Sequence, residues 1–243
     1  MPAKNRHVKG KVATKNKVPS QTKKPRAGAD RVVTTQPLTS YDIFKLCIER
    51  AENLVKLHKA AHGKAGKPEK YTADAHRASI VLSISALDAF IRDFVICRTR
   101  ELLAMKSHAL PTALSVQIKR FIKDDELLEA ARKDDLLERV EKAFRNDFEK
   151  RSFQGTKNIE EMLQVVGYKN VFHEVAMKAK MNEDTLRHDL DKFTQRRHAI
   201  AHRGDYELSQ NPPKENVVTK KDAEDCIKLV RRIAKHMQKQ GAS

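Results

Sequence analysis

The strongest constraint on the fold is an apolar pattern that repeats every three or four residues along residues 73–105. Its members are Ile80, Ile84, Leu87, Ile91, Phe94 and Val95. This spacing places apolar side chains on one face of an α-helix, whereas a half-buried strand would alternate apolar and polar residues. A helix over residues 73–105 is therefore predicted, and other elements must cover its apolar face.

Similar stripes recur along most of the chain. They predict further helices over residues 40–62 (with Ser40 as N-cap), 123–150, 183–203 and 219–241 (opening on a Thr219–Asp222 capping box). Aromatic residues make up only 5% of the chain and tryptophan is missing, so aliphatic side chains must fill the core. That composition suits packed helices, and no alternating strand pattern is found. We predict an all-α, antiparallel helical bundle over residues 39–243.

The first 38 residues differ in composition from the rest. Residues 1–37 hold ten Lys or Arg and one acid, Asp30, in a chain whose net charge is +17. They lack Phe, Tyr and any helical period, so they cannot bury enough apolar surface to fold. We predict a disordered basic tail over residues 1–38 that attracts nucleic acid through its phosphates. A solubilising tail without a specific partner is the alternative.

Cysteine usage and hydropathy bear on the protein's surroundings. Cys47, Cys97 and Cys226 are far apart, odd in number and in no CxxC arrangement, which disfavours a disulfide framework or a thiolate zinc site. No apolar run approaches the ~18–20 residues that a membrane span requires, and no apolar signal segment begins the chain. We expect a cytoplasmic protein with no membrane contact, no metal and no other cofactor.

The densest chemistry lies between Gln195 and Asp205, in the predicted helix 183–203. The apolar stripe of this helix consists of Leu186, Leu190, Phe193 and Ile200. Arg197 falls on the same stripe, where a guanidinium is costly unless an anion meets it. Two anions are plausible. One is the carboxylate of Asp88, on the margin of the earlier stripe, and the other is a bound phosphate, whose oxygens match the planar fork of arginine.

His198 and His202 lie one helical turn apart on one face. A neutral imidazole can take a proton from a ribose 2′-OH, and its conjugate acid can protonate a leaving oxygen. An arginine can stabilise the charge that builds up around phosphorus, so these residue types can cleave RNA without a metal. Two other interpretations stay open. The histidines could be a zinc pair, with Asp205 as the only acid nearby, or they could favour a helix C-terminus.

Regular helical geometry turns Arg197 about 140° away from His202. One copy of the chain would therefore present these two side chains in different directions. A frayed last turn before Gly204, or a second copy of the chain, could bring an arginine and a histidine together.

The stretch from Arg197 to His202 resembles the Arg-x4-His signature of HEPN domains, an all-α family of RNA-cleaving and nucleotide-binding proteins. Residues 197–204 read Arg-His-Ala-Ile-Ala-His-Arg-Gly, with the polar His198 after the arginine. Ser85–Arg92 resembles the preceding helix of the RiboL-PSP subgroup of HEPN domains. The middle portion of that subgroup is similar to Ser152–Gln154, Ile159–Leu163 and Val171–Phe172. The resemblance covers about residues 40–240, and the acidic segment 123–150 and the basic tail depart from the family pattern.

The resemblance implies a homodimer in which two motif helices face each other, so that both copies supply Arg and His to one cleft. It also implies a metal-independent endoribonuclease that leaves 2′,3′-cyclic phosphate ends, often as a toxin or in antiviral defence. RNA would be the substrate, and an antitoxin or regulatory protein a further partner. In this chain Arg197 would hold the phosphate, His202 would transfer protons and His198 would assist.

Three more residues complete the predicted site. Asp88 would support Arg197 as its paired anion, and Arg196 and Arg203 would contact the RNA. Two alternative functions are a non-catalytic HEPN module that binds RNA or a partner protein, and a structural helical adaptor that its basic tail tethers to nucleic acid.

Overall fold

The computed structural model describes residues 38–61, 70–105, 109–209 and 211–241, and the structural statements below concern these residues. Its elements are α1 (Ser40–Ala61), α2 (Lys70–Ala104), α3 (Thr112–Phe121), α4 (Asp124–Lys133), α5 (Leu136–Glu149), α6 (Thr156–Val165), α7 (Val171–Ala179), α8 (Glu183–Arg203), β1 (Tyr206–Glu207), β2 (Lys214–Glu215) and α9 (Lys220–Gly241). The predicted all-α fold is confirmed. The predicted tail lies outside the described residues except for Leu38. None of the helices in these ranges is long and apolar enough to cross a membrane.

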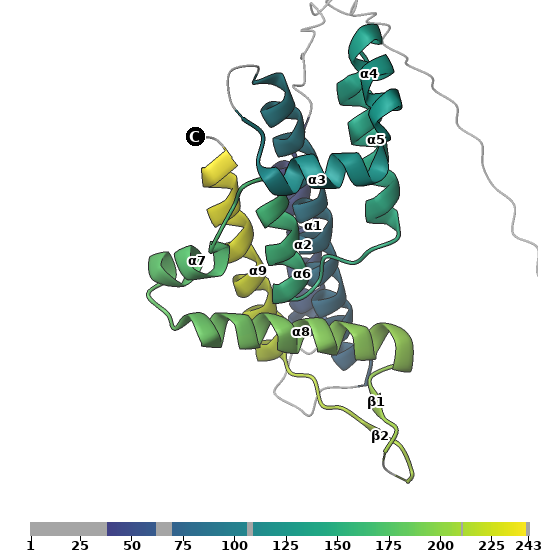
Figure 1. Ribbon diagram of the computed structural model, residues 1–243. Coiled ribbons are helices and arrows are strands. Elements are labelled where there is room, and N and C mark those ends of the chain that lie inside the picture. Colours follow the sequence, from purple (N-terminus) through teal and green to yellow (C-terminus); the bar gives the residue numbers. More distant parts are fainter. Residues whose placement is uncertain (1–37, 62–69, 106–108, 210, 242–243) are drawn as a thin grey trace, which may run out of the picture. The chain divides into compact units, whose positions relative to one another are not determined.

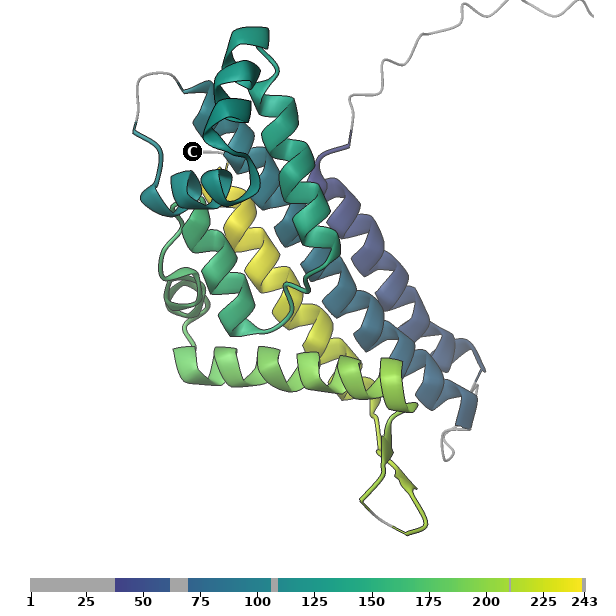
Figure 2. The ribbon, with the colours of Figure 1, turned by 45° about the vertical axis from the view of Figure 1, so that its right-hand side comes forward.

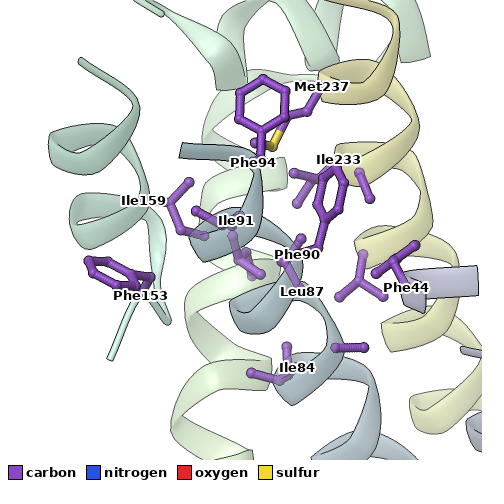
Figure 3. Packing of buried hydrophobic residues seen from close by; sticks show 14 of the residues in the cluster. Phe44, Ile84, Leu87, Phe90, Ile91, Phe94, Phe153, Ile159, Ile233 and Met237 are labelled. Carbon is purple, nitrogen blue, oxygen red and sulfur yellow. The ribbon is translucent and has the colours of Figure 1, made fainter. Parts of the chain in front are cut away.

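Helix α2 is the centre of the core. It contacts α1, α9, α8, α5 and α6, and α1, α2 and α9 lie side by side, with α1 and α2 antiparallel (Figures 1 and 2). The six members of the predicted stripe on α2 are all buried. Figure 3 shows side chains of α2 between Phe44 of α1, Ile233 of α9 and Ile159 of α6. Burial of these large apolar groups is the main force that holds the helices together.

The predicted helix over residues 123–150 is two helices, α4 and α5. The first ends where Asp134 takes a left-handed conformation, with φ at 57°. Aspartate adopts this conformation more readily than bulky or β-branched residues do. Val140, Phe144 and Phe148 are buried on α5. The prediction of one continuous helix was wrong because the apolar spacing runs on across the break.

Helices α1 and α9 begin with the same reciprocal cap. In α1 the cap is Thr39 and not Ser40 as predicted. Thr39 Oγ1 accepts a hydrogen bond from the amide of Asp42 at 3.1 Å, and Asp42 Oδ2 accepts one from the amide of Thr39 at 3.1 Å. The predicted box in α9 is confirmed, since Thr219 Oγ1 accepts from the amide of Asp222 at 3.1 Å and Asp222 Oδ2 accepts from the amide of Thr219 at 2.8 Å. Both caps satisfy amides that the helix itself leaves unpaired.

Replacing Thr219 with alanine tests the cap of α9. The change removes the hydroxyl that accepts from the Asp222 amide. We expect the free energy of unfolding to fall by about 1 kcal/mol, as is usual when a helix loses its N-cap. Urea denaturation at neutral pH measures the loss. Thr112→Ala is the matched control because α3 has no side-chain cap hydrogen bond, and an equal loss in both variants would contradict the assigned cap.

Candidate functional site

Helix α8 carries the motif and lies across α2 and α9 (Figures 1 and 2). Asn182 caps its start, where the side-chain oxygen accepts a hydrogen bond from the Thr185 amide at 3.0 Å. Gly204 ends it in a left-handed conformation, with φ at 58°. The buried face of the helix consists of Leu186, Leu190 and Phe193. Caps at both ends and this apolar face hold the motif on a fixed helix.

Arg197 lies on the side of α8 that carries these buried residues, as its place on the stripe predicts. Its side chain is half-buried, and its Nε is shielded from solvent with no hydrogen-bond partner in the described ranges. A buried nitrogen without a partner is unfavourable. The guanidinium also forms no ion pair with any residue that the structure describes, so this part of the chain supplies Arg197 with no anion.

Asp88 does not pair with Arg197, so that part of the predicted site is wrong. Asp88 Oδ1 accepts a hydrogen bond from the amide of Phe153 at 2.7 Å, and its Oδ2 pairs with Arg92 Nη2 at 2.9 Å. Arg92 in turn donates to the carbonyl oxygens of Phe148 and Arg151, each at 2.7 Å. Asp88 and Arg92 thus fix the segment between α5 and α6 on the side of α2.

His198 and His202 lie one turn apart, with ring centroids 4.4 Å from each other and ring planes tilted by 44°, and both side chains are exposed. The helix is regular as far as Arg203, so the last turn does not fray to bring His202 round to Arg197. The angle of about 140° between these two side chains therefore stands. In the described residues, no three His, Cys, Asp or Glu side chains are grouped so that they could hold a metal ion.

A hollow of about 430 Å³ opens beside His198. Its lining residues are Ser152, Gln154, Thr194, Gln195, His198, Ala199 and Arg203. The segment that Asp88 and Arg92 fix therefore forms one wall, and α8 forms the other. Ser152 also lines a larger hollow of about 510 Å³ that reaches to Gln117 and Asn158. The predicted RNA contact Arg203 lies in the hollow with His198.

Arg196 is placed differently from its prediction as an RNA contact. Its Nη2 donates to Asp205 Oδ2 at 2.7 Å and to the carbonyl oxygen of Val217 at 2.9 Å. The side chain of Asp205 is fully buried, and Arg77 Nε of α2 donates to the same oxygen at 2.8 Å. Arg77 Nη2 also donates to the carbonyl oxygen of Asn216 at 2.7 Å. The partly buried guanidinium of Arg196 is thus bound to other residues of the chain, and through Asp205 it links the end of α8 to Arg77 of α2.

Arg77 is the site-forming residue that the sequence patterns did not single out. It precedes Ile80 by three residues, so it extends the apolar stripe of α2. An arginine on an apolar stripe is expected to be buried and to require an anionic partner, so the pattern could have identified Arg77. Burial opposes its charge, but hydrogen bonds to Asp205 and Asp74 outweigh burial and raise the pKa of Arg77. The guanidinium thus stays charged within the core.

Comparison with known proteins gives one match. The family model described as RiboL-PSP-HEPN matches residues 45–240, which is most of the chain and includes α8. A search of curated proteins and a search of solved structures each gave no match.

Replacing Asp205 with alanine tests the buried network. The change leaves the guanidinium groups of Arg77 and Arg196 without their shared carboxylate. Arg77 Nη1 keeps its ion pairs with Asp74 and Glu215, but Arg77 Nε and Arg196 lose their carboxylate partner. We therefore expect the free energy of unfolding to fall by about 3 kcal/mol, because a buried ion pair is broken on one side. Chemical denaturation followed by circular dichroism measures the change.

The matched control for this variant is Asp225→Ala. Asp225 is 44% exposed and meets Lys228 at 3.5 Å, so its loss should cost less than about 1 kcal/mol. Similar small losses in both variants would show that the Asp205 network does not secure the end of α8.

Proposed function

The chain belongs to the RiboL-PSP-HEPN family, and we propose that it is a metal-independent endoribonuclease whose reactive residues are Arg197 and His202. Members of this family cleave or bind RNA, so a role on RNA is indicated. The observation that carries the finer proposal is the state of Arg197, which is half-buried and forms no ion pair with the described residues. His202, five residues further along the same fixed helix, is exposed.

The proposed reaction is an attack of the ribose 2′-oxygen on the adjacent phosphorus. The O2′–P bond forms and the P–O5′ bond breaks, which yields a 2′,3′-cyclic phosphate and a 5′-hydroxyl. A neutral His202 takes the 2′-OH proton. The protonated imidazole of His202 then gives a proton to the departing 5′-oxygen. Arg197 stabilises the negative charge that gathers on the phosphoryl oxygens. DNA has no 2′-OH and is not a substrate.

His198 and Arg203 have supporting roles in this proposal. Both line the hollow beside α8, and the ring of His198 lies against that of His202. His198 orients the reactive imidazole, and Arg203 contacts a phosphate of the RNA strand. Arg196 is left out, because its guanidinium binds Asp205 and Val217.

The geometry of α8 favours a site shared between two copies of the chain. Arg197 and His202 of one copy point about 140° apart, and the helix is regular across both of them. Arg197 is only half-buried, so a twofold axis that sets two α8 helices edge to edge would place His202 of one copy beside the exposed part of Arg197 of the other. We therefore propose a homodimer with both copies contributing to one cleft.

An endoribonuclease of this kind would harm the cell that makes it unless it were controlled. We accordingly propose a role as a toxin or an antiviral defence protein, with an antitoxin or regulatory protein as a partner. The family match supports a nuclease or RNA-binding activity in general terms.

Replacing His202 with alanine tests the reactive residues. In EDTA, with total RNA as substrate, we expect cleavage to slow by about 10²–10⁴-fold, because proton transfer is lost. Arg197→Ala should slow it by about 10²–10³-fold through lost charge stabilisation. His188→Ala, an exposed histidine on the same helix, should cleave like the unaltered protein.

The same assay separates the competing functions. Cleavage undiminished by His202→Ala would contradict the assignment. RNA binding by the unaltered protein without any cleavage would select a non-catalytic module instead.

Mixed dimers test the shared site. Arg197→Ala and His202→Ala should each cut RNA only slowly alone, but two tagged variants that are co-expressed and purified as a mixture should regain activity. We expect roughly a quarter of the unaltered rate, because about half the dimers are mixed and each holds one intact Arg–His pair. A mixture as inactive as its parents would show that the pair acts within one copy.

A further inference from the structure

A second hollow, of about 230 Å³, lies between α7 and α9, away from the residues used above. Its lining residues are Val175, Lys178, Ala179, Arg232, Lys235, His236 and Lys239. Four of these seven side chains are Lys or Arg, a fifth is histidine, and none is acidic. The hollow beside His198 also lacks an acidic residue, but Arg203 is the one Lys or Arg in its lining.

The sequence explains why these cations converge. Arg232, Lys235 and Lys239 follow one another at spacings of three and four residues, so they project from one face of α9. Lys178 stands in the last turn of α7, which packs against α9. Positive side chains from two helices therefore line the hollow, and like charges held together repel each other.

His236 forms the inner wall of this hollow. Its side chain is buried, and its Nε2 lies 3.0 Å from Glu174 Oε2, which also accepts a hydrogen bond from Gln240 Nε2 at 2.9 Å. The Nδ1 of His236 is shielded and has no hydrogen-bond partner in the described ranges. Burial lowers the pKa of His236, and Lys178 lowers it further, against the opposing effect of Glu174. The imidazole thus experiences the positive potential of the hollow, although a carboxylate touches its other side.

This hollow is separate from the proposed cleavage site. Asp222, at the start of α9, lines a hollow with Gln195 and Arg196 of α8. His236 follows Asp222 by fourteen residues on the same helix, which places the two about 21 Å apart. One phosphate group cannot occupy both places.

We propose that the hollow between α7 and α9 is a binding site for a phosphate group. Lysine and arginine are the side chains that recognise phosphate oxygens, and several of them around one hollow bind it cooperatively with little rearrangement. The volume is below the roughly 300 Å³ at which pockets for whole drug-sized ligands begin. It therefore takes a phosphate or diphosphate group, and any base or sugar attached to that group stays outside. The group belongs either to an RNA backbone or to a free phosphate compound.

Two double variants of the full chain test this proposal. Lys178→Gln with Lys235→Gln removes two charges from the hollow. Lys119→Gln with Lys142→Gln removes two from exposed positions on α3 and α5 and is the matched control. Both are made with His202→Ala, so that RNA is not cut. Binding of inorganic pyrophosphate is measured by calorimetry, and binding of single-stranded oligouridine by fluorescence anisotropy at several salt concentrations.

The proposal predicts that the hollow variant, unlike the control, binds at least one of these probes about tenfold more weakly. If RNA supplies the phosphate, the slope of log K against log salt becomes shallower by about 0.7 for each phosphate that the variant no longer neutralises. If a free phosphate compound is the ligand, only pyrophosphate binding falls. Equal binding of both probes by the hollow and control variants would overturn the proposal. None of these readouts involves cleavage, so they stand or fall independently of the proposed nuclease activity.

Discussion

The buried carboxylate of Asp205 is the interaction on which the rest of the motif depends. It lies directly after the residue that ends α8, and it receives hydrogen bonds from Arg77 of α2 at 2.8 Å and Arg196 of α8 at 2.7 Å. Arg77 also pairs with Asp74 and Glu215, but Asp205 is the buried carboxylate that both guanidinium groups share, and removing one side of a buried ion pair is strongly unfavourable. The network therefore fixes where α8 stops and how its last turns lie on the core. Without it, the exposed histidines would sit on a fraying helix end.

Because α8 is held in one position, its motif residues lie on two different faces of the helix. The core-facing side presents Arg197, half-buried and without an anion in the described chain, while the open side presents His198 and His202. The same rigidity that preorganises each face prevents them from converging within one copy. A regular α8 therefore requires a two-copy site in this proposal. Rigid placement of Arg197 favours catalysis only if the second copy supplies the histidine that acts beside it.

Much of the fold follows from the sequence, because helical stripes depend on neighbours three and four residues apart. The stripe from Ile80 to Val95 and the Thr219–Asp222 cap were predicted on that basis and are confirmed. Contacts between distant segments were not predictable in this way. Asp88 was assigned to Arg197 because it borders the apolar stripe of α2 and Arg197 lies on that of α8. Its partners are instead Arg92 and the amide of Phe153, in a segment whose path the pattern does not specify. The pairing of Arg77 with Asp205 spans 128 residues and likewise requires the fold.

The central claim is that the ribose 2′-oxygen is the nucleophile at the α8 motif. Its most direct test uses a short RNA with one mapped cleavage position and a copy in which only the nucleotide on the 5′ side of that bond is 2′-deoxy. The purified protein should cut the all-ribose strand in EDTA and leave the substituted bond intact, because the attacking oxygen is gone. Cleavage of the 2′-deoxy bond at an undiminished rate would contradict the account, because the nucleophile would then be water.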